Sequence, residues 1–169
     1  IPGYYNLADR GQQLNRQLSD KNVKWDNEAN QQLQLGTTTA YGPRLLAPLL
    51  PVLREVVSDP AERKLVEQLA LWPGDYPLDS ISATLFNQFL FNLTDATLRD
   101  ELGNDFFETL LSTRVIDAAL PRLAASADSP WWDNRATPAK ETRADTVKVA
   151  WQASIAHLKT TLGADSAQW

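Results

Sequence analysis

The stretch VKVAWQASIAHLKTTLG, residues 147–163, decides the fold class. Large apolar side chains recur in it at spacings of four, four, three and four residues, at Val147, Trp151, Ile155, Leu158 and Leu162. This is the period of one face of an α-helix. A glycine follows directly and is expected to end the helix, because glycine readily adopts the conformation found at helix C-termini. The stretch therefore predicts a long helix with one buried face.

Helix starts can also be recognised farther upstream. Asp26, with an acid two residues later, is expected to cap a helix that runs to Leu35. Asp59 and Pro60 form the pattern of a capping residue followed by proline at the first helical position. These signals extend the helical prediction to the first half of the chain.

Proline and glycine indicate where helices break. Pro48 and Pro51 each remove a backbone donor inside an apolar helical stretch, and Pro121 does the same in a later one. Gly103 is expected to stop a separate short helix that begins at Asp95. No alternating strand pattern of useful length occurs. We therefore expect an all-α irregular helical bundle of about seven to nine helices, forming one helical segment over residues 1–169.

The composition excludes several function classes. The 169 residues are 43% hydrophobic and 22% charged, with a net charge of −5. An acidic balance argues against nucleic acid or an anionic membrane as a partner. No apolar run approaches the ~20 residues that span a bilayer. The chain has no cysteine and one histidine, which excludes a thiolate nucleophile and leaves little room for a histidine metal cluster.

The chain has no methionine and starts at Ile1. A translated chain begins with methionine, so we interpret the sequence as an internal segment of a longer protein. Such a segment can lack catalytic groups of its own.

Few residues suggest chemistry by themselves. His157 lies off the apolar stripe of its helix and is expected to be partly solvated. A stand-alone hydrolase that used Ser80 and His157 would need these two side chains within hydrogen-bond reach. No G-x-S-x-G motif supports such a pair.

The clustered acids and tryptophans also favour structural roles. Asp75 with Asp79, and the acids from Asp100 to Asp105, lack the spacing and central glycine of a calcium loop. We therefore expect no metal site, with Asp79 as a helix cap and Asp95 and Asp105 as helix-start acids. The adjacent Trp131 and Trp132 are expected to anchor a loop over residues 124–138 to the body.

Three separated stretches resemble the penicillin acylases, also called penicillin amidases, which are N-terminal nucleophile hydrolases. Gly3-Tyr4-Tyr5 leads into residues 8–18, which resemble the family's Arg-x5-Arg stretch through Arg10 and Arg16. Residues 59–86 resemble its Leu-x-x-Trp-Asp-Gly stretch and the helix that follows, with Pro73 where the family has aspartate. Residues 158–169 resemble the lead-in to its Trp-Gly-x-x-His stretch.

The resemblance implies an internal piece of the β chain of an acylase, a helical subdomain beside a larger αββα core. In that family an N-terminal serine attacks the acyl carbon of an amide, its α-amine serves as base, and oxyanion donors hold the charge. Ile1 has no hydroxyl, so the nucleophile, the oxyanion asparagine and the calcium ligands are expected upstream of residue 1. Arg10 is the one position that matches a family active-site residue. No cofactor is expected within the segment.

The implied partners are the remainder of the α and β chains and a small acyl amide, and the implied location is the periplasm. Two substrate classes remain open, β-lactams and N-acyl-homoserine lactones, and the substrate-binding residues are unknown. The alternative is a non-enzymatic helical protein-interaction module with a polar, well-covered surface. The acylase interpretation instead predicts unpaired apolar surface, in particular near Tyr4, Tyr5 and Trp169, and no activity for the segment alone.

Overall fold

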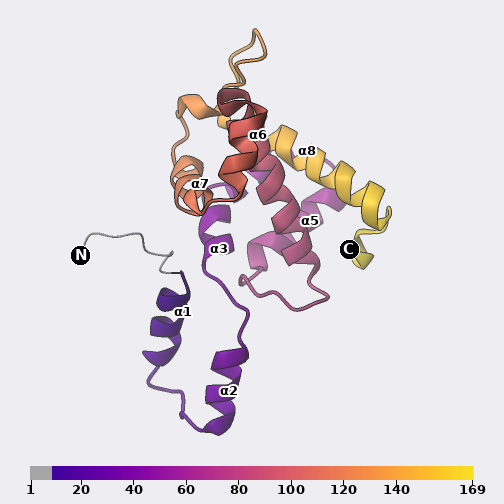
Figure 1. The fold of residues 1–169 in the computed structure, drawn as a ribbon. Helices are drawn as coiled ribbons and strands as arrows, with labels where there is room; N and C mark the ends of the chain where they lie inside the picture. Colours follow the sequence, from indigo (N-terminus) through magenta and orange to yellow (C-terminus); the bar gives the residue numbers. More distant parts are fainter. Residues whose placement is uncertain (1–8) are drawn as a thin grey trace, which may run out of the picture.

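The computed structural model describes residues 9–169, and this part of the chain is all-α, as predicted. It contains eight α-helices, which Figure 1 shows as an irregular bundle. Their bounds are α1 (Asp9–Leu18), α2 (Asn27–Leu35), α3 (Tyr41–Leu46), α4 (Leu50–Val56), α5 (Pro60–Leu71), α6 (Ile81–Leu111), α7 (Val115–Ala125) and α8 (Arg143–Leu162). Two 3-10 turns follow α7 and α8, η1 (Pro130–Trp132) and η2 (Ser166–Gln168).

The pairing of α6 with α8 forms the centre of the body. The apolar stripe predicted for α8 is buried in it, apart from its last residue, Leu162. Trp151 packs edge-on against Phe89 of α6, with ring centroids 5.9 Å apart. Its indole N–H also donates to Glu62 of α5 at 2.9 Å. Each large apolar side chain buried here contributes about 1.5–3 kcal/mol, so this helix pair supports the rest of the body.

The predicted caps at Asp26 and Asp59 and the first proline break are confirmed. The carboxylate of Asp26 accepts the N–H of Ala29 at the start of α2, and that of Asp59 accepts two N–H groups at the start of α5. The apolar stretch that carries Pro48 is divided between α3 and α4. Gly163, with φ of 101°, ends α8 as expected.

Three details of the helix prediction are wrong. Asp95 does not begin a helix: it lies inside the 31-residue α6, where it pairs with Arg99 one turn later. Such pairs stabilise a helix interior, so the acid needs no helix end. Pro121 does not interrupt α7, because the buried Leu120 and Ala124 hold the helix against the body on either side of it. The N-cap of α6 is Ser80, and Asp79 does not cap it.

Gly103 does interrupt α6, as a kink at which two helical parts join. Its φ of 72° and ψ of 165° are not helical. The side chain of Arg99 bridges the kink: it donates to Asp95 at 2.6 Å before it and to Asn104 at 3.1 Å after it. Its guanidinium also lies 4.1 Å from the ring centroid of the buried Phe107. These contacts fix the direction of the last turns of α6.

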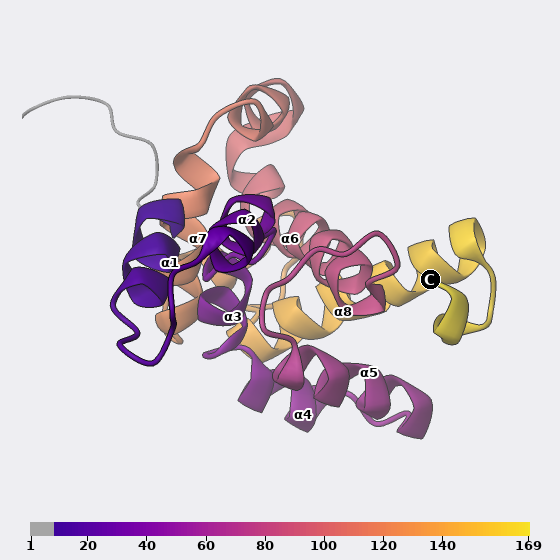
Figure 2. The ribbon, with the colours of Figure 1, turned by 90° about the horizontal axis from the view of Figure 1, so that it is seen from below.

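Helices α1 and α2 form an arm that extends from the body (Figure 1). Seen from below, the two helices lie next to each other (Figure 2). None of residues 10–40 is buried. We call α1, α2 and the segment up to Ala40 the arm. Its position is therefore set by its connection to the body and not by a core of its own.

The prediction of exposed, unpaired apolar surface near Trp169 is wrong for this side chain. It is only 8% exposed, and its indole N–H donates to the carbonyl of Gly163 at 2.9 Å. Trp169 belongs to the buried core cluster, and the preceding turn η2 contacts α6. Tyr4 and Tyr5 lie outside the described residues. Among residues 9–169, no helix is long and apolar enough to cross a membrane.

Candidate functional site

The loop at Trp72, one of the family-like stretches, anchors the arm to the body. The N–H of Thr39 donates to the carbonyl of Gly74 at 2.8 Å. A Cβ on Gly74 would lie 2.1 Å from the carbonyl oxygen of Thr39, and its φ is +88°, so only glycine fits. Trp72 is buried, and its indole N–H donates to the carbonyl of Asp75 at 2.8 Å. The same indole packs so closely on Gly42 that a Cβ there would lie 2.5 Å from it.

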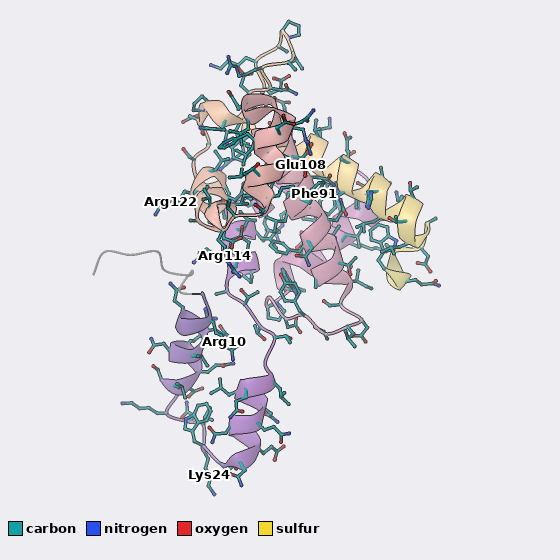
Figure 3. All side chains as sticks on the ribbon, in the orientation of Figure 1. Arg10, Lys24, Phe91, Glu108, Arg114 and Arg122 are labelled. Carbon is teal, nitrogen blue, oxygen red and sulfur yellow. The ribbon has the colours of Figure 1, made fainter. Side chains whose placement is uncertain are left out.

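Arg10, the predicted active-site residue, lies in the first turn of α1 on this arm (Figure 3). Its side chain is exposed and forms no ion pair with the described residues. It lines a small hollow between α1, α2 and the segment that follows α2. The side-chain oxygen of Gln13 is buried beside this hollow without a hydrogen-bond partner. The hollow has a volume of about 20 Å³, which suits a water molecule and not an acyl amide.

Ser80 and His157 do not form a nucleophile–base pair. The hydroxyl of Ser80 accepts the N–H of Ala83 at 3.2 Å and caps α6. His157 is exposed on α8, and its imidazole makes no hydrogen bond within the described residues. This part of the chain therefore holds no hydrolytic triad built on its histidine.

Asp100, Glu101 and Glu141 are used in structural contacts. Asp100 accepts the N–H of Arg135 at 2.8 Å, and Glu101 pairs with the guanidinium of Arg135 at 2.9 Å, which ties the loop after η1 to α6. The carboxylate of Glu141 accepts the hydroxyl of Thr137 at 2.5 Å, and this hydrogen bond is the main cause that lowers the pKa of Glu141. No group of three or more potential ligands in the described residues is arranged to hold a metal ion.

Two further pKa shifts have local causes. The hydroxyl of Thr142 donates to Asp145 at 2.6 Å in the capping box of α8, and this bond lowers the pKa of the Asp145 carboxyl. Burial, with a smaller contribution from Asp117, raises the pKa of Tyr41. The Tyr41 hydroxyl is buried without a hydrogen-bond partner. A phenol with a raised pKa stays protonated and is a poor general base.

A larger cavity lies elsewhere, between the second half of α6, α7 and η1. We call it the α6–α7 groove. It has a volume of about 770 Å³ and a mostly apolar lining that includes Leu102, Phe106 and Ile116. Trp131 lines the groove and is exposed, whereas Trp132 is buried and donates its indole N–H to the carbonyl of Ser126 at 2.8 Å. Trp132 is thus the predicted loop anchor, and Trp131 belongs to the groove.

The helical pattern of the sequence alone does not locate this groove. The pattern predicts only an all-α bundle for this part of the chain. The available signal was the large apolar residues of the stretch 106–123, among them Phe106, Leu110 and Ile116. The tertiary direction of α6 after Gly103 leaves them facing each other across open space.

Residues 9–169 thus form a helical body from which an arm that carries Arg10 extends. The family model described as penicillin amidase matches residues 1–169, so the chain belongs to the penicillin amidase family. This confirms the resemblance drawn from the three stretches. The comparisons with curated proteins and with solved structures found no match.

Proposed function

We propose that this chain is a helical segment of an amide hydrolase that removes an acyl group from an amide-linked substrate. The family match over residues 1–169 is the observation that carries this proposal. The enzyme would be an N-terminal nucleophile hydrolase, whose serine, oxyanion donors and calcium ligands lie in other parts of the protein. The two candidate substrate classes are β-lactams and N-acyl-homoserine lactones, and the family resemblance suggests the periplasm as its location.

Arg10 is the residue of this segment that we assign to the active site. Its guanidinium is exposed, unpaired within the described residues, and carried on an arm that packs little on its own body. A planar, permanently charged group of this kind orients carboxylates or carbonyls through paired hydrogen bonds. In the proposed enzyme it holds groups around the substrate while the serine supplied elsewhere attacks the acyl carbon.

The alternative of a complete interaction module predicts a polar, well-covered surface. The α6–α7 groove, with Phe106 and Val115 each 58% exposed, favours a segment that belongs to a larger protein. The partners that we propose are therefore the remaining parts of the acylase and its small acyl amide substrate.

Hydrolysis assays on the enzyme that carries this chain test the proposal. Benzylpenicillin and N-decanoyl-homoserine lactone represent the two classes, and release of the free amine is the readout. Arg10→Lys is expected to lower kcat/KM by about ten- to a hundredfold, equivalent to ~1.4–2.8 kcal/mol of transition-state stabilisation.

The matched control is Arg16→Lys, an exposed arginine in the last turn of the same helix. It should leave kcat/KM unchanged. The residues 1–169 alone should hydrolyse neither substrate. No turnover by the enzyme on either class would refute the proposed function, and an equal loss in the two variants would refute the role of Arg10.

A further inference from the structure

The two walls of the α6–α7 groove have the spacing of helix faces. On α6 the lining residues lie four positions apart on each side of the kink at Gly103, at Leu98 and Leu102 before it and at Phe106 and Leu110 after it. On α7 they recur at spacings of three and four, at Ile116, Ala119 and Leu123. Two helices that turn such rows toward a common space form ridges that a third helix can fill. The groove therefore has the form of a vacant helix position in a bundle.

No described residue fills this position. Phe106 and Val115 are each 58% exposed, and Trp131 is 40% exposed. Large apolar side chains from three elements are therefore exposed around one groove, and exposed apolar side chains that gather in this way mark interaction sites. Aromatic side chains of this kind are common anchors in interfaces.

The charge at the groove is positive. Arg122 is the only charged residue in its lining, and it forms no ion pair with any described residue. On its other side Arg122 borders a second hollow, which Arg44 and Asp117 also line. That hollow is lined by two guanidinium groups and one carboxylate, although the whole chain has a net charge of −5. Figure 3 shows Arg122 on α7.

We propose that the α6–α7 groove is the docking site for an amphipathic helix from another part of the same enzyme. The docked helix presents apolar side chains at helical spacing to the two ridges and a carboxylate to Arg122. An amphipathic helix in an apolar groove is a recurrent mode of recognition, and the carboxylate sets its direction along the groove. This inference rests on the proposed function, because it requires a larger enzyme around the segment.

Cysteine labelling in the enzyme tests the inference, since residues 1–169 contain no cysteine. Val115→Cys places a thiol in the groove, and Val149→Cys places one on α8 at almost the same exposure, 57% against 58%. Labelling by a maleimide is followed over the background of the unsubstituted enzyme. The expected result is labelling of Val115→Cys at least tenfold slower than that of Val149→Cys, with equal rates after unfolding in guanidinium chloride. Equal rates for the two thiols in the folded enzyme would overturn the inference.

Further labelling experiments identify the occupant of the groove. Protection of Val115→Cys that disappears on dilution would assign the groove to a second copy of the protein. Protection that requires added dodecanoate would assign it to a small amphiphile. Either result overturns the helix proposal, whereas protection independent of both supports it.

Charge reversal tests the role of Arg122. Arg122→Glu is expected to lower the Tm of the enzyme more than Lys64→Glu, which makes the same change of charge at an exposed position on α5. Equal decreases in Tm for the two variants would show that no carboxylate of the docked helix pairs with Arg122. The result is separable from the proposed function: a protected thiol in an enzyme without amide hydrolysis leaves the docking site standing, and a reactive thiol in an active enzyme refutes the docking site alone.

Discussion

Substitution of Gly74 by alanine tests how the arm is held. Gly74 has φ of +88°, and a Cβ there would lie 2.1 Å from the carbonyl oxygen of Thr39. The left-handed conformation costs a non-glycine residue about 1–2 kcal/mol. The clash also pushes the segment at Thr39 away from Gly74, which breaks the Thr39 N–H···O=C Gly74 hydrogen bond of 2.8 Å. Loss of this hydrogen bond lowers the stability by about 0.5–1.5 kcal/mol. We expect Gly74→Ala to lower the free energy of unfolding by about 1.5–3.5 kcal/mol.

Two other glycines separate these contributions. Gly103 also has a positive φ, +72°, but nothing lies within 4 Å of a Cβ there, so Gly103→Ala shows the conformational cost alone. Gly11 lies inside α1 with nothing near its Cβ, and Gly11→Ala should stabilise the chain by roughly 0.5–1 kcal/mol. Urea unfolding measures the free energy of unfolding of all three variants. If Gly74→Ala proves no more destabilising than Gly103→Ala, the contact with Thr39 does not hold the arm.

Trp151→Phe removes the indole hydrogen bond to Glu62 in a side chain that is 1% exposed, and should cost about 2 kcal/mol. Trp131→Phe changes an exposed ring and should lower the Tm much less than Trp151→Phe. Equal decreases in Tm for the two variants would contradict the hydrogen bond from Trp151 to Glu62 as a source of stability. Thr142→Ala should cost about 1 kcal/mol at neutral pH as a lost N-cap. The lowered pKa of Asp145 contributes stability above its unfolded pKa of about 3.9, and this stability is lost as the pH falls through the folded value. Thermal unfolding from about pH 7 to about pH 2 should therefore show a shallower acid decline for Thr142→Ala, and an unchanged slope would refute the linkage.

The all-α class and most helix ends were predictable because their causes are local. The cap at Asp26 and the break between helices around Pro48 each depend on residues within one helical turn. Pro121 was misjudged because its effect is decided by distant packing: burial of Leu120 and Ala124 offsets one lost hydrogen bond. Trp169 was misjudged for the same reason, since its cover comes from the carbonyl of Gly163 and from η2 folding back.

The candidate site was predictable only in part. The family stretches pointed to Arg10 and to the loop at Trp72, and the structure shows that this loop holds the arm that carries Arg10. The groove could not be foreseen, because it depends on the direction that α6 takes after Gly103. That direction is fixed by Arg99, whose contacts before and after the kink involve side chains that the sequence pattern does not link.

Because the chain is synthesised from its N-terminus, the arm is made before the loop that holds it. Residues 9–40 leave the ribosome before Gly74 exists, so the arm has no docking point while it is being synthesised. The placement of Arg10 is then inherited from a loop more than sixty residues later in the chain. Natural variation that repositions this arginine would accordingly be found at residues 72–77 and not beside Arg10 itself.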